Sequence, residues 1–136
     1  MKNFAVVVGL VIISIVLTIQ VWGEEKTVKA LIDSDGIQRV ELVGGSYFFK
    51  PERIIVKVDV PVELKFRKES GMVPHNIVMD APEAGIAFDL PLASEPKIVT
   101  FTPTKPGEYP FYCSKKLMFF ESHKEKGMEG MLEVVK

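Results

Sequence analysis

The chain has 136 residues, with 17 lysines and arginines against 18 aspartates and glutamates. This near balance supplies no excess of basic residues for nucleic acid, and we expect no nucleic-acid partner. The single cysteine cannot form a disulfide within the chain, so the fold must be held together by packing alone.

The first 23 residues have the pattern of an export signal. Lys2 precedes a run from Phe4 to Ile19 that is apolar except for one serine and one threonine, and Val21 and Gly23 suit a cleavage site. The segment is a secretory signal peptide or, if it stays attached, a membrane anchor close to the lower length limit for a span. In both cases we expect residues 24–136 to form one exported domain, periplasmic or otherwise extracytoplasmic.

The exported part contains a series of short strand patterns in which apolar residues alternate with polar ones. The segments are 39–49, 53–58, 60–67, 75–82, 97–103, 109–113 and 130–135. Glycines and prolines between them mark turns. Some seven to eight short strands with little helical periodicity predict an all-β fold, a Greek-key sandwich or barrel.

Two segments do not fit a strand pattern. Residues 83–95 ("EAGIAFDLPLASE") have Pro91 in their middle, which predicts a loop with a helical turn. Residues 114–127 ("SKKLMFFESHKEKG") predict one or two helical turns that end at Gly127.

Four residues together indicate a metal site. They are His75, Cys113, His123 and Met128, and the first three include every histidine and cysteine of the chain. Each has an ordinary structural explanation, as a buried thiol, a hydrogen-bonded histidine or a core methionine. Two histidines and a cysteine with a long axial methionine are, however, the arrangement of type 1 copper sites, which transfer electrons.

The sequence around these residues resembles the cupredoxins, in particular the plastocyanin and auracyanin type. "VPHNIVMD" is similar to the strand that carries the first ligand, and "GEYPFYCS" is similar to the penultimate strand. "HKEKGMEGMLEV" matches His-x₄-Met-x-Gly followed by the last strand, and "YFFKPERIIVKVDVPVELKF" resembles the earlier strand pair. The resemblance implies a cupredoxin domain over residues 24–136.

The resemblance also implies a ligand set for one copper ion, Cu(I) or Cu(II). His75 and His123 would bind through imidazole nitrogen, Cys113 through its thiolate and Met128 weakly along the axis. Asn76 would tie the first ligand strand to the cysteine loop near Ser114. No open coordination position is implied, so we expect no enzymatic activity.

One departure from the family concerns the spacing between Cys113 and His123. The family usually has two to four residues between these ligands, and this chain has nine, "SKKLMFFES". If His123 were displaced, Glu121 or Met118 would be the alternative ligand. A two-copper site would need a second cysteine at Leu117, and that hypothesis fails.

The "LMFF" stretch, residues 117–120, allows two interpretations. These side chains either pack beneath the extended loop or form an exposed apolar patch at which a redox partner docks. Four lysines would surround such a patch and steer the encounter: Lys115, Lys116, Lys124 and Lys126.

The leading functional hypothesis is a monomeric copper protein that carries one electron between redox partners, a cytochrome or an oxidase docking near the Leu117–Phe120 loop. A membrane would be involved only through residues 1–23. Three alternatives stay open. The first is a copper-delivery protein for oxidase assembly, with Met118, Met128 and Met131 as soft ligands. The others are the copper-binding head of a membrane oxidase and a metal-free adaptor.

Overall fold

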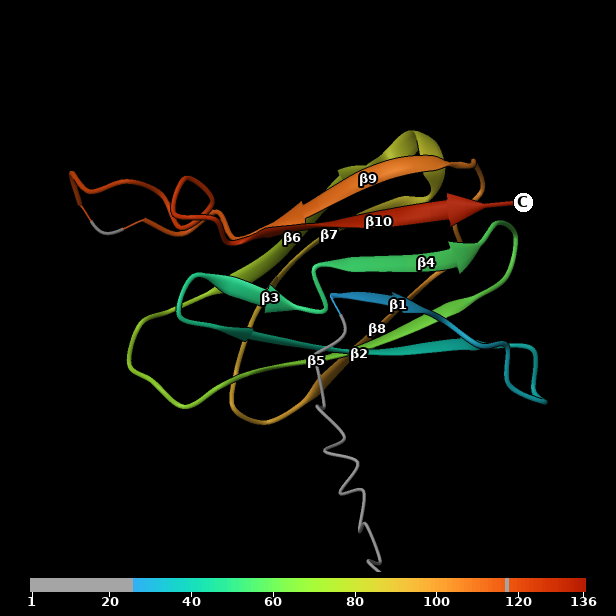
Figure 1. Cartoon of the computed structure of the whole chain (residues 1–136), viewed down its shortest axis with the longest axis horizontal. Coiled ribbons are helices and arrows are strands. Elements are labelled where there is room, and N and C mark those ends of the chain that lie inside the picture. Colours follow the sequence, from blue (N-terminus) through green and yellow to red (C-terminus); the bar gives the residue numbers. More distant parts are fainter. Residues whose placement is uncertain (1–25, 117) are drawn as a thin grey trace, which may run out of the picture.

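The structure is a computed structural model that describes residues 26–116 and 118–136 (Figure 1). The predicted signal or anchor at residues 1–23 lies outside the described residues, and so does Leu117. Across the two described ranges, no helix is long and apolar enough to span a bilayer.

The described residues form ten strands and one 3₁₀ turn. In chain order they are β1 (Thr27–Lys29), β2 (Gln38–Gly45), β3 (Phe48–Lys50), β4 (Arg53–Lys57), β5 (Val62–Lys68), β6 (Asn76–Ala81), η1 (Pro82–Ala84), β7 (Ile86–Pro91), β8 (Lys97–Phe101), β9 (Gly107–Tyr112) and β10 (Glu129–Val135). Six strands form one sheet in the order β1-β4-β10-β9-β6-β7, and four form the other in the order β3-β2-β5-β8. The predicted all-β sandwich is confirmed.

The core lies between the two sheets and takes alternate residues from their strands. In β5 the buried residues are Val62, Leu64 and Phe66, and the residues between them are less buried or exposed. This period of two was predicted, because successive side chains of a strand point to opposite faces. The buried core cluster falls within residues 40–134, so a chain that starts at residue 24 retains all of it.

Residues 83–95 differ from the predicted loop. A 3₁₀ turn does begin at Pro82, but Ile86–Pro91 then form β7, which pairs with β6 at the edge of the larger sheet. Pro91 is the last residue of this edge strand, where its missing N–H costs no hydrogen bond to a further strand. The loop prediction is therefore wrong for β7, because a proline excludes a central strand but not an edge strand.

Three neighbouring strands bring their ends together at one end of the larger sheet. β9 lies between β10 and β6 and runs antiparallel to both. His75 precedes β6, Cys113 follows β9 and Met128 precedes β10. Because one antiparallel strand starts where its neighbour ends, these three residues meet at one end of the sandwich, at the left in Figure 1. We call it the site end.

Candidate metal centre

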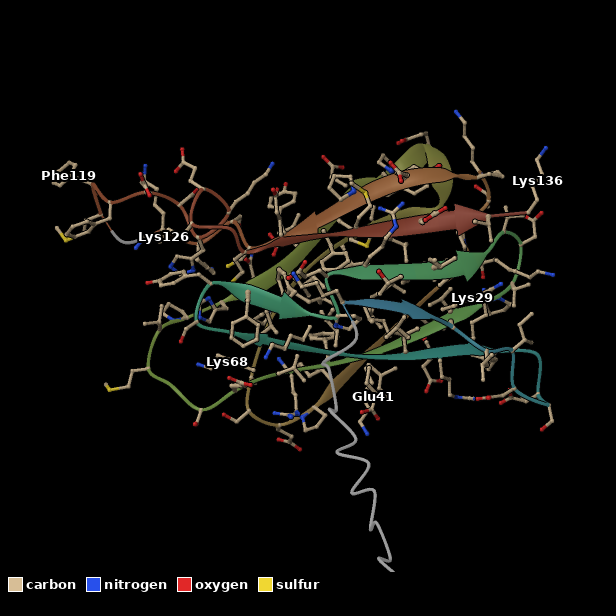
Figure 2. The ribbon with its side chains drawn as sticks, in the orientation of Figure 1. Lys29, Glu41, Lys68, Phe119, Lys126 and Lys136 are labelled. Carbon is tan, nitrogen blue, oxygen red and sulfur yellow. The ribbon has the colours of Figure 1, made fainter. Side chains whose placement is uncertain are left out.

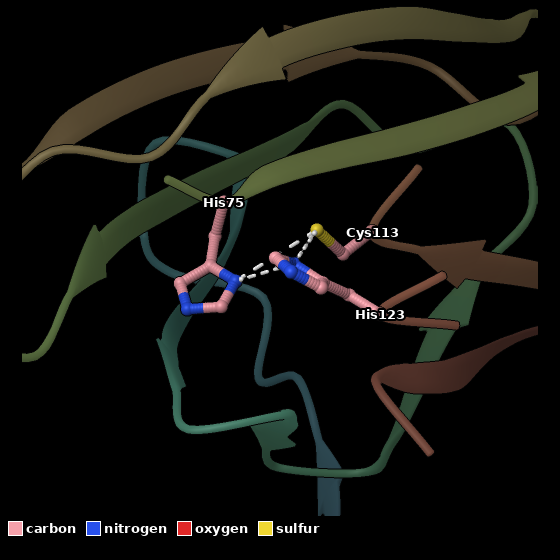
Figure 3. Close-up of side chains that lie close together, drawn as sticks. All are labelled: His75, Cys113 and His123. Atoms are coloured by element: carbon pink, nitrogen blue, oxygen red, sulfur yellow. Dashed lines mark hydrogen bonds between the residues drawn. The ribbon is translucent and has the colours of Figure 1, made fainter. Parts of the chain in front are cut away.

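Three metal-binding side chains converge at the site end. The Nδ1 atoms of His75 and His123 lie 3.1 Å apart. Cys113 Sγ lies 3.9 Å from His75 Nδ1 and 3.4 Å from His123 Nδ1. Figure 3 shows the three side chains pointing toward one another. All three residues are buried, so water has little access to their donor atoms.

The spacing of these donor atoms fits one transition-metal ion. A first-row ion binds imidazole nitrogen at about 2.0–2.1 Å and thiolate sulfur at about 2.3 Å, so two donors on one ion stand about 3–4 Å apart. The three separations, 3.1, 3.4 and 3.9 Å, fall within this range. A thiolate with two imidazoles is also a donor set suited to copper. The cluster is therefore able to hold one copper ion.

Met128 lies directly beside His123 and Cys113. Its N–H donates to the His123 carbonyl (2.9 Å), and its own carbonyl accepts from the Cys113 N–H (3.1 Å). The side chain is fully buried. A Cβ added at Gly44 would stand 3.2 Å from the Met128 terminal methyl group, so the glycine leaves room for this side chain.

The spacer between Cys113 and His123 extends away from the sandwich like a hairpin. The His123 N–H donates to the Lys115 carbonyl (2.8 Å), and Lys116 forms an antiparallel bridge with Ser122. These two pairings close the base of the loop. Residues 116 and 118–122, which we call the finger, therefore project beyond the site end, and His123 returns next to the cysteine (Figure 1).

The two alternative ligands lie on the finger and not in the cluster. Glu121 is exposed, and Met118 is 78% exposed. Both therefore stay in contact with solvent, whereas His123 is 1% exposed and lies within the triangle of donor atoms.

A single hydrogen-bonded turn connects His123 to Met128, where one or two helical turns were predicted. The Ser122 N–H donates to the Glu125 carboxylate (2.7 Å), and the Glu125 N–H donates to the Ser122 hydroxyl (3.2 Å), as in a capping box. Gly127 ends the turn with a φ of 95°, a conformation that favours glycine. The turn thus fixes the path between the two predicted ligands.

Comparison with known proteins identifies the family. The family model of the cupredoxin-like domain matches residues 10–128. The chain belongs to the cupredoxin-like family. A search of curated proteins gives no significant match to this cupredoxin.

Copper proteins are among the solved structures that this cupredoxin resembles. The metal-binding domain of the Cu(I)-exporting P-type ATPase CopA of Streptococcus pneumoniae, solved with Cu(I), is 25% identical over 84% of this chain and 100% of that domain, with a TM-score of 0.62. A copper-binding protein in the apo form is 27% identical over 80% of this chain and 97% of its own, with a TM-score of 0.57. Auracyanin of Roseiflexus castenholzii shares the fold at 20% identity, over 84% and 100% of the chains, with a TM-score of 0.55. The predicted family is confirmed.

Asn76 ties two segments of the cupredoxin site together. Its Nδ2 donates to Ser114 Oγ and to Asp89 Oδ1, and its Oδ1 accepts from the Ser114 N–H, each at 2.8 Å. The Asn76 N–H also donates to Cys113 Sγ at 3.5 Å. The predicted link between Asn76 and Ser114 is confirmed. Such contacts hold ligands in position and adjust the properties of a bound metal.

Burial favours the neutral form of both imidazoles. Burial, followed by the charges of His123 and Lys68, lowers the pKa of His75 from 6.5 to about 4. Burial, followed by the charge of Lys126, also lowers the pKa of His123. Metal ions bind the neutral imidazole, so both rings are in the binding form at neutral pH.

Three neighbours of the site were not predicted from the sequence. The Tyr47 ring stands edge-on to the His123 ring, with centroids 5.0 Å apart, and Lys126 Nζ lies 4.5 Å from the Tyr47 centroid. Besides Tyr47, the unpredicted neighbours are Gly44, which faces Met128, and Asp89, which accepts from Asn76. The stretch "GGSYFF" carries only a strand pattern, and no spacing rule connects residue 47 with a histidine so far along the chain.

The finger has an apolar tip that faces solvent. Phe119 is 97% exposed, Met118 78% and Phe120 68%. The interpretation that this stretch packs beneath the loop is therefore wrong for these three residues, which are exposed, and the docking of a redox partner there stays a prediction. Leu117 lies outside the described residues.

Proposed function

We propose that this protein carries one electron between redox partners on a single copper ion. His75, Cys113 and His123 would hold the ion through two imidazole nitrogens and one thiolate, with Met128 as a weak axial ligand. Bound copper supplies the one-electron couple between Cu(I) and Cu(II). The observation that carries the proposal is the buried triangle of two Nδ1 atoms and one Sγ.

The surroundings of the triangle favour a carrier over an enzyme. The four predicted ligand residues are at most 5% exposed, which leaves little room for a substrate to approach. The hydrogen bonds of Asn76 restrain the first ligand strand and the cysteine loop. A restrained ligand set moves little when the charge of the ion changes, which suits electron transfer. We place this activity outside the cytoplasm, as the N-terminal pattern predicts.

Copper delivery is the second candidate function. It is favoured by the likeness to a domain of a Cu(I) exporter that was solved with Cu(I). A delivery protein must pass its ion to a partner, so its ligands need to be reachable. Burial of all four predicted ligand residues supports the carrier instead. A third role, the head of a membrane oxidase, would require residues 1–23 to remain attached as an anchor.

A copper titration of residues 24–136 tests the proposal. We expect an intense visible band that is complete at one equivalent of Cu(II), is bleached reversibly by ascorbate and is lost in Cys113→Ser. Met128→Leu should shift the band, whereas Met79→Leu, at a buried methionine in β6, should leave it unchanged. No band, together with rapid reaction of Cys113 with a thiol reagent, would refute the copper site.

A chelator experiment separates the two candidate functions. The reduced, copper-loaded protein is mixed with a Cu(I) chelator, and the transfer of copper is followed by the colour of the chelator complex. A carrier should retain its ion and continue to exchange electrons with a soluble cytochrome. Fast loss of copper to the chelator, without electron exchange, would favour delivery.

A further inference from the structure

The tip of the finger is an exposed apolar surface at the site end. Met118, Phe119 and Phe120 follow one another along the chain and are 78%, 97% and 68% exposed. Figure 2 shows Phe119 at the far end of the finger, beyond the strands of both sheets. Large apolar side chains gathered at one exposed place mark a contact surface.

The charges around the finger are mainly positive. Four exposed lysines lie in residues 114–127: Lys115, Lys116, Lys124 and Lys126. Only Glu121 and Glu125 oppose them, which gives this stretch a net charge of +2 in a chain whose total is −1. Lys126 Nζ lies over the Tyr47 ring beside the site, at the base of the finger. A surface that binds here should therefore carry negative charge.

Exposed apolar side chains with basic residues behind them are the pattern of a surface that binds anionic lipid. None of Met118, Phe119 and Phe120 belongs to the packed core, and no ring contact of Phe119 or Phe120 is found among the described residues. A lipid interface accepts apolar side chains in many arrangements, and basic residues behind them bind anionic headgroups.

We propose that the finger docks this domain on an anionic lipid surface. Met118, Phe119 and Phe120 enter the headgroup region, and the lysines contact lipid phosphates. Docking turns the site end toward the membrane. The inference requires only the finger and not the copper, so metal-free protein should bind vesicles as well as copper-loaded protein.

Vesicle flotation with residues 24–136, which retain the whole core, tests the proposal without the N-terminal segment. We expect binding to vesicles of phosphatidylcholine mixed with phosphatidylglycerol, and much weaker binding to phosphatidylcholine alone. Phe119→Ser/Phe120→Ser should lower the partition coefficient at least about tenfold. Lys115→Gln/Lys116→Gln should lower it about tenfold at low salt and less at high salt.

Matched controls come from the opposite end of the sandwich. Leu31 and Ile32 are exposed apolar neighbours in the β1–β2 loop, and Lys29 and Lys136 lie far from the finger in Figure 2. Leu31→Ser/Ile32→Ser and Lys29→Gln/Lys136→Gln should bind vesicles like the parent protein.

An equal partition coefficient for the parent and the Phe119→Ser/Phe120→Ser variant would overturn the proposal. If that variant also exchanged electrons more slowly with an acidic redox protein, the finger would be assigned to a protein partner. The visible copper band, recorded on the same samples, shows separately whether the metal site itself is present.

Discussion

Acid should destabilise the metal-free protein through His75. The folded protein holds this residue neutral, with its pKa lowered by burial to about 4, whereas the unfolded chain takes up a proton near 6.5. Below the unfolded value the unfolded state therefore binds more protons, and acid favours unfolding. For His75 alone, the free energy of unfolding should fall by about 2 kcal/mol between about pH 7 and about pH 5. His123, whose pKa is also lowered, adds to the fall.

Urea unfolding of metal-free residues 24–136 measures this change. The unfolding is monitored by far-UV circular dichroism. His75→Asn is the control, because it removes the titrating group, and it should lose less stability than the parent over the same pH range. The loss should level off below the folded pKa of about 4. A free energy of unfolding that stays constant from about pH 7 to about pH 5 would refute a buried, neutral His75.

Three further perturbations test the packing around the site. Gly44→Ala would set a Cβ 2.9 Å from a Leu92 methyl group and 3.2 Å from that of Met128, so it should cost about 1–3 kcal/mol in urea unfolding and shift the copper band. An unchanged spectrum would mean that Met128 is not confined there. Asn76→Ala removes the link to the cysteine loop and should cost about 2–4 kcal/mol, and a loss below about 1 kcal/mol would contradict that link. Replacing residues 117–121 by two glycines should leave the band intact, whereas its loss would show that the finger supports the site.

Much of the fold follows from local sequence patterns. Alternation in residues 60–67 predicts both the strand β5 and its buried face, because one face of each sheet packs on the other. The edge strand β7 was missed because Pro91 is a strong local signal, and only the order of strands in the sheet shows that β7 has no outer neighbour. That order depends on contacts between distant segments, which no local pattern contains.

The candidate site shows the same limit. Residue types and family spacing were enough to select His75, Cys113, His123 and Met128. The path of the long spacer was not predictable, because it depends on the backbone pairing of Lys115 with His123 and of Lys116 with Ser122, which closes the finger. The approach of Tyr47 to His123 likewise follows from the packing of β2–β3 against the site end, which only the assembled sandwich defines.

The position of β10 sets a time at which the site can form. β10 lies between β4 and β9 in the larger sheet, yet it is the last of these strands to leave the ribosome. Until it is made, β4 and β9 lack their shared neighbour, and His123 and Met128 have not joined His75 and Cys113. A nascent chain that ends at Tyr112 therefore carries only one of the four predicted ligands. Assembly of the four-residue site therefore has to wait for the synthesis of β10, the last strand in the sequence.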